Sequence, residues 1–88
     1  MHEMSLMTNL MRQIEVLAKE HQATRVCGIK IRLGALSHFS KEHFKEHFDI
    51  VAKGSLAEGA QLDIELLADE DDPLAYDVII EEIDVDGP

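Results

Sequence analysis

Residues 26–34, VCGIKIRLG, decide the centre of the fold. Apolar and charged side chains alternate in this stretch: the apolar ones are Ile29, Ile31 and Leu33, and the charged ones are Lys30 and Arg32. A period of two residues is typical of a half-buried β-strand. Val26 is out of phase with this alternation and a glycine lies between, so we expect a β-bulge near residues 27–28. The stretch therefore predicts a strand that ends at Gly34.

Two amphipathic helices are expected on either side of this strand. The first is expected over about residues 4–21, because apolar side chains recur there at helical spacing. These side chains are Met7, Leu10, Met11, Ile14, Leu17 and Ala18. The second helix is expected from an N-cap at Ser40 to about Lys53, with Gly54 placed to end it. Its predicted inner face holds Phe44, Phe48 and Val51.

Two further strands complete the predicted sheet. One is expected around residues 62–66, where Leu, Ile and Leu alternate with acidic residues. The other is expected over Tyr76–Val85, where Glu81-Glu82 interrupts the apolar phase and indicates a bulge or an edge. Between them lies the acidic turn Asp69–Pro73. We therefore expect one α+β domain over residues 1–88, ordered α-β-α-β-β. Its last two strands would form an antiparallel hairpin, and both helices would cover one face of the three-stranded sheet.

Composition limits the class of function. Residues 1–53 hold eight bases and six acids, a net charge of +2, whereas residues 54–88 hold twelve acids and no base, a net charge of −12. A total of −10 argues against nucleic acid and anionic membrane as partners, because both need positive counter-charge. The sequence shows no signal peptide and no membrane-spanning run, and its single cysteine fits a reducing compartment, so we expect a cytoplasmic protein.

The first three residues carry the most distinctive chemistry. The amine of Met1, the backbone nitrogen of His2 and the Nδ1 atom of His2 can close adjacent chelate rings around one metal ion. Glu3 adds a further backbone nitrogen and a carboxylate. Ni(II) and Cu(II) can displace an amide proton because they gain from a strong square-planar nitrogen field. The alternative is that His2 is an exposed residue of a frayed chain end with no ligand role.

His43 and His47 form a second candidate metal site. They are four residues apart on the second predicted helix, so their rings can face the same way, and a third ligand from elsewhere would complete a site. No HExxH motif is present, and the surrounding Lys-Glu pairs favour an ordinary solvated surface. The role of His38, five residues before His43, is left open by the sequence.

The remaining candidate residues favour structural roles. The methionines at helical spacing are expected to fill the core rather than bind Cu(I). Cys27 is expected to be buried and inert, and the acidic cluster at 69–72 to be a solvated turn rather than a calcium loop. No nucleophile elbow, phosphate loop or dinucleotide fingerprint is present, so we expect a protein that is not an enzyme.

Three segments together resemble one known family. They are Met1–Leu6 (MHEMSL), Gly34–Ser37 (GALS) and Ser55–Leu62 (SLAEGAQL). In this order and spacing they resemble the HypA/HybF nickel metallochaperones of hydrogenase and urease maturation, over about residues 1–68. The resemblance implies nickel held by the amine of Met1, the imidazole of His2 and the backbone nitrogens of His2 and Glu3, with a supporting role for the Glu3 side chain.

The resemblance also implies partners, but this sequence lacks one domain that the family normally carries. Its members deliver nickel with a maturation GTPase to an enzyme such as the large subunit of [NiFe]-hydrogenase. They normally carry a zinc domain with two CxxC pairs, inserted between the second and last strands. Here the turn Asp69–Pro73 takes that place, so no structural zinc is expected. An adaptor that kept the fold but lost metal transfer is the alternative function, and whether the chain forms a homo-oligomer is left open.

Overall fold

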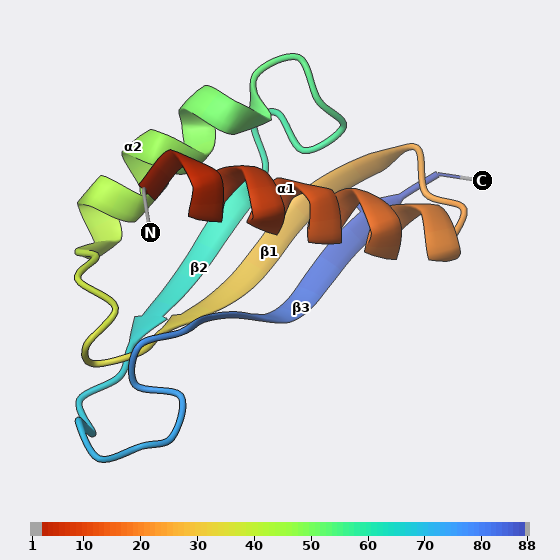
Figure 1. Ribbon diagram of the computed structural model, residues 1–88. Helices are drawn as coiled ribbons and strands as arrows, with labels where there is room; N and C mark the ends of the chain where they lie inside the picture. The colour runs from red at the N-terminus through yellow and green to blue at the C-terminus, as the bar shows by residue number, and fades with distance from the viewer. Residues whose placement is uncertain (1–2, 88) are drawn as a thin grey trace.

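The computed structural model describes residues 3–87, with side chains from residue 5 onward. Within this range the chain forms two helices and three strands, and both helices lie on one face of the sheet (Figure 1). The elements are α1 (Glu3–Glu20), β1 (Arg25–Leu33), α2 (Lys41–Ala52), β2 (Gln61–Leu66) and β3 (Val78–Asp86). The predicted α+β class and the order α-β-α-β-β are confirmed.

The strand order corrects one expectation. The sheet has the order β2-β1-β3, in which β1 pairs in parallel with β2 and antiparallel with β3. The predicted hairpin of the last two strands is therefore wrong, because β2 and β3 lie on opposite sides of β1. Helix α2 carries the chain from the end of β1 back to the start of β2, and such a crossover places two strands side by side in parallel. The central strand is the one whose apolar side chains are almost wholly buried.

The bulge predicted near residues 27–28 is present, and the interruption at Glu81-Glu82, predicted as a bulge or an edge, is a bulge in an edge strand. Each bulge restores the phase of its strand. The pairing of β1 with β3 shifts between Val26 and Gly28, and again between Lys30 and Ile31, where Glu81 is the extra residue of β3. Val26 is thereby returned to the buried face of β1, where it is 0% exposed. An extra residue turns the following side chains to the other face, so each strand keeps its apolar residues under the helices on both sides of its bulge.

The core lies between the helices and the sheet. Ser40 caps α2 by accepting a hydrogen bond from the backbone N–H of His43, as predicted, and Gly54 follows the helix with a left-handed φ of +80°. Phe44 and Phe48 stack with ring centroids 6.4 Å apart. The largest fully buried side chains are Phe44, Phe48, Met7, Ile14, Ile31, Leu33 and Val26. Met7 and Met11 are therefore core residues, which confirms the structural interpretation of the methionine stripe.

Two of the three segments that carry the resemblance form hydrogen bonds at the ends of the central strand. In residues 55–60, the Ser55 hydroxyl donates to the Ala52 carbonyl (2.7 Å) and accepts from the Ala57 N–H (3.1 Å), while the Leu56 carbonyl accepts from Val26 (2.9 Å). At the other end of β1, Gly34 donates to the Asp77 carbonyl (2.9 Å). These segments bind the two ends of the central strand to the rest of the chain.

The connection 67–77 crosses the end of β1 and passes directly over Gly34. A Cβ atom at Gly34 would collide with the backbone of Leu74 and Ala75, so this crossing requires glycine. Leu67 and Leu36 add backbone hydrogen bonds to Leu33 and Ala75. The short acidic connection is thus docked on the sheet, at the position where the resemblance places a zinc domain.

Candidate metal centre

Helix α1 begins at Glu3, which is the last of the three residues of the predicted chelate. Met1 and His2 lie outside the described residues, and of Glu3 only the backbone is described. An α-helix leaves the N–H groups of its first four residues without a carbonyl partner inside the helix. A metal ion that displaced the amide proton of Glu3 would therefore break no hydrogen bond of α1.

The side chains of His43 and His47 come together on α2. Their Nε2 atoms are 2.8 Å apart, and their ring centroids are 4.4 Å apart with an interplanar angle of 63°. One ring donates an N–H to the lone pair of the other, in either direction. Both side chains are half-buried, and the Phe39 ring stands 5.8 Å from that of His43. The sequence predicted that the rings could face the same way, and the structure confirms it.

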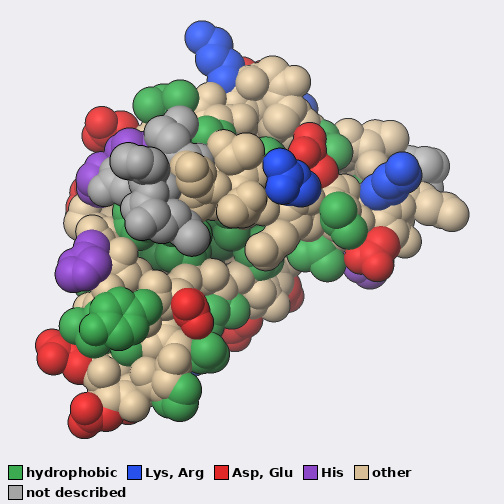
Figure 2. All heavy atoms as spheres, in the orientation of Figure 1, with side chains coloured by type: hydrophobic (Ala, Val, Ile, Leu, Met, Phe, Trp, Pro, Cys, Tyr) green, Lys and Arg blue, Asp and Glu red, His purple; other side chains and the backbone are tan. Residues whose placement is uncertain are grey.

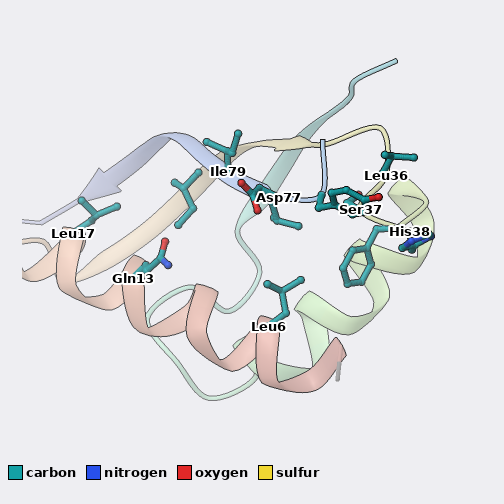
Figure 3. A pocket seen from close by; sticks show the side chains of 12 residues that line it. Leu6, Gln13, Leu17, Leu36, Ser37, His38, Asp77 and Ile79 are labelled. Carbon is teal, nitrogen blue, oxygen red and sulfur yellow. The ribbon is translucent and has the colours of Figure 1, made fainter. Parts of the chain in front are cut away.

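A groove runs between the first turn of α1 and residues 36–39, the segment that leads into α2 (Figure 3). It has a volume of about 740 Å³, and its lining includes Leu6 from the first turn of α1 together with His38 and Phe39 just before α2. Its other wall is the start of β3, with Tyr76 exposed at the rim. In Figure 2, histidine side chains lie on the surface at this same end of the molecule.

The groove is the feature that sequence reasoning missed. It forms between α1 and β3, whose adjacency depends on the sheet order that was predicted wrongly. Ser37, from the GALS segment, also lines it, and its hydroxyl is buried with no hydrogen-bond partner among the described residues. No residue type or spacing in the sequence marks this groove, because a single exposed aromatic side chain such as Tyr76 is ordinary on a protein surface.

The structure also tests the expectations for Cys27 and for the acidic turn. Cys27 is exposed, so the expectation of a buried cysteine is wrong: the bulge at this position leaves it as the extra residue, facing away from the core. The acidic turn is solvated, as expected: Asp69 and Asp72 accept hydrogen bonds from the backbone N–H groups of Asp71 (2.9 Å) and Leu74 (2.8 Å). The described part of the chain holds no group of three His, Cys, Asp or Glu side chains able to bind a metal ion.

Comparison with known families gives one consistent result. The HypA family model, described as a hydrogenase/urease nickel incorporation metallochaperone, matches residues 1–70. Hydrogenase maturation factor HypA of Methylocella silvestris is 40% identical over 70 residues, which are 80% of this chain and 62% of that protein. Hydrogenase maturation factor HybF of Salmonella typhimurium is 37% identical over 65 residues, which are 74% of this chain and 58% of that protein. The chain thus spans less than two thirds of the length of these curated relatives.

Solved structures share the fold. The solution structure of the Ni metallochaperone HypA from Helicobacter pylori aligns with a TM-score of 0.83 at 19% identity, covering 100% of both chains. A second solution structure of a HypA protein gives a TM-score of 0.73 at 18% identity, covering 96% of this chain and 95% of that one. The structural alignment therefore includes β3, which lies beyond the residues that the family model matches. Neither α1 nor α2 as described is long and apolar enough to cross a lipid bilayer.

Proposed function

Because this chain belongs to the HypA family, whose model matches residues 1–70, we propose that it is a nickel metallochaperone, a carrier protein rather than an enzyme. Its cargo would be Ni(II), bound by the amine of Met1, the imidazole and backbone nitrogen of His2, and the backbone nitrogen of Glu3. The observation that carries the proposal is the MHE sequence, whose last residue, Glu3, is the first residue of helix α1. That arrangement supports an open chelate whose amide nitrogens are not needed by the helix.

The proposed acceptor is a nickel enzyme of the hydrogenase class. Relatives of this chain are named hydrogenase maturation factors, and the family resemblance implies a maturation GTPase or the hydrogenase large subunit as the docking partner in the cytoplasm. The 88 residues form one nickel-binding domain in this proposal. A four-cysteine zinc site cannot be built from a sequence that holds one cysteine, so we propose that nickel is carried without a resident zinc ion.

Calorimetric titration of Ni(II) into the untagged protein tests the proposal. We expect a tight site with the absorption of square-planar Ni(II) and release of protons on binding, since amide and imidazole nitrogens must be deprotonated to act as ligands. His2→Ala should remove this site, weakening it by at least about 100-fold, and an added N-terminal extension should do the same. His21→Ala, which removes an exposed histidine after α1, is the matched control. A tight square-planar site that persisted in His2→Ala would contradict the proposal.

An adaptor without metal transfer is the second candidate function. It is favoured by the short docked connection 67–77 and by the net charge of −12 over residues 54–88, which suits a basic partner surface. Co-purification with a large enzyme subunit distinguishes the two. Complex formation that is stable, sensitive to salt and unchanged by His2→Ala, in a chain that does not bind nickel, would favour the adaptor.

A further inference from the structure

The two Nε2 atoms of His43 and His47 face each other across 2.8 Å. Only one hydrogen fits between them, so one nitrogen presents a lone pair to the shared position and the other presents its N–H. The folded helix already holds these two potential ligand atoms close together, so binding a metal ion requires little further ordering of the two side chains. A metal ion would replace the shared hydrogen, whose proton passes to the Nδ1 atom of the same ring, and would lie to one side of the line that joins the two Nε2 atoms.

The observed separation suits a metal ion. Two nitrogen ligands at about 2.0–2.1 Å from a metal ion are about 2.9 Å apart when they bind at right angles, and about 3.3–3.4 Å apart in the tetrahedral geometry of Zn(II). The rings of His43 and His47 therefore need only a small rotation, and no movement of α2, to direct both lone pairs at one ion. Residues four apart on a helix keep this relation as long as the helix is rigid. Ser40 caps α2, and Phe44 and Phe48 anchor it with exposures of 0% and 1%.

We propose that His43 and His47 form an independent second metal site, which binds a divalent ion of the Ni(II), Cu(II), Co(II) and Zn(II) class. The pair supplies two imidazole nitrogens, and water completes the coordination. Binding here displaces no backbone amide proton, so Zn(II) and Co(II) can bind as well, whereas the chelate at the chain start requires a metal that favours square-planar nitrogen. Zinc is therefore a selective probe of the pair.

The position of the pair gives it a use in nickel transfer, and this step rests on the proposed function. Leu6 in the first turn of α1 lines the same groove as Phe39, and the Phe39 ring is 5.8 Å from the ring of His43. Glu3 begins that first turn, so a metal ion bound by its backbone nitrogen would lie at the end of the molecule that carries the pair. The pair would offer a second, more labile position for an ion leaving the chelate.

Zn(II) titration of four untagged proteins tests the site: the natural chain, His2→Ala, the double variant H43Q/H47Q and the control H21Q/H38N. Glutamine keeps helix propensity on α2. Asparagine tolerates the left-handed conformation of His38, whose φ is +67°. We expect the Kd for Zn(II) to rise at least tenfold in H43Q/H47Q and to stay within twofold in the other two variants. A second measurement, independent of variant folding, follows the histidine ring resonances of the natural chain, where Zn(II) should shift those of His43 and His47 and leave His21 in place.

Ni(II) stoichiometry separates this proposal from the proposed function. The natural chain should bind two ions, and His2→Ala and H43Q/H47Q should each bind one. Loss of all nickel in either variant would show a single composite site and overturn the independence of the pair, as would Zn(II) binding unchanged in H43Q/H47Q. Nickel binding that depended on the pair but not on His2 would support the second site while refuting the chelate at the chain start.

Discussion

Helices α1 and α2 cover one face of the sheet and leave the opposite face open (Figure 1). The covered face is apolar, whereas the open face carries charged side chains. On β1, Val26, Ile31 and Leu33 point under the helices and are 0% exposed. On the open face, the Arg32 Nε atom lies 3.3 Å from carboxylate oxygens of both Glu65 and Glu81. The same three strands thus build a shape-dependent core on one side and a solvated ion-pair network on the other.

This difference shows where stability and function reside. Packing of buried apolar side chains depends on shape and is lost when a side chain is removed, whereas exposed charges are replaced by water at little cost. The helices that close the core also place the first turn of α1 and the His43–His47 pair at one end of the molecule. We therefore expect substitutions under the helices to affect folding strongly, and substitutions on the open face to affect it weakly.

Removal of Phe44 should have the largest effect on stability. Its ring is 0% exposed and contacts Phe39 and Phe48, with centroids 5.6 Å and 6.4 Å away. Phe44→Ala should lower the free energy of unfolding by about 3–5 kcal/mol, as measured by urea denaturation. The control is Tyr76→Ala, because Tyr76 is 71% exposed. A change of about 0.5 kcal/mol or less is expected for the control. Similar losses in the two variants would contradict the inference that stability comes from the buried side chains under the helices.

Substitution of Gly34 tests the crossing of the 67–77 connection. A Cβ atom there meets the backbone of Leu74 and Ala75, which cannot move without releasing the hydrogen bonds from Gly34 to Asp77 and from Leu36 to Ala75. Gly34→Ala should therefore destabilise the fold by about 1–3 kcal/mol. Gly54→Ala is a useful contrast, since a Cβ atom at Gly54 meets nothing within 4 Å and only its left-handed φ opposes the change. Faster amide hydrogen exchange in β3 of Gly34→Ala would locate the damage.

The features predicted correctly from the sequence are local. The N-cap at Ser40, the glycine after α2, the bulge near residues 27–28 and the interruption of β3 follow from residue type and apolar phase within a few positions. Strand order is not local, since the period of a strand shows which face is buried but not which strand lies beside it. A helix between two strands was the neglected signal, because such a crossover favours a parallel pair.

The candidate site was predictable only in part. Helical spacing was enough to place the His43 and His47 rings on one side of α2, but the approach of their Nε2 atoms to 2.8 Å depends on rotamers that spacing does not encode. The error on Cys27 has a similar origin, because a bulge was expected but the side chain that it would turn outward was not assigned. The nickel ligands at residues 1–3 stay a prediction.

Removal of the cap of α2 should have an intermediate effect. The Ser40 hydroxyl accepts the backbone N–H of His43 at 3.0 Å, at the first turn of the helix that carries the histidine pair. Ser40→Ala should cost about 1 kcal/mol and increase hydrogen exchange at His43, whereas Ser40→Asp should keep the cap and the stability. If Ser40→Ala also weakened Zn(II) binding and Ser40→Asp did not, the order of the first turn of α2 would be shown to support the proposed second site.

The open face should tolerate the loss of its central charge. Arg32 pairs with two carboxylates, yet its side chain is 42% exposed, and those of Glu65 and Glu81 are 53% and 39% exposed. Water solvates all three groups when the pairs break, so Arg32→Ala should lower the free energy of unfolding by less than about 1 kcal/mol. The loss should shrink further in 1 M salt, where screening acts within about 3 Å. A cost comparable with that of Phe44→Ala, and insensitive to salt, would mean that the open face is covered by a further surface, such as a second copy of the chain.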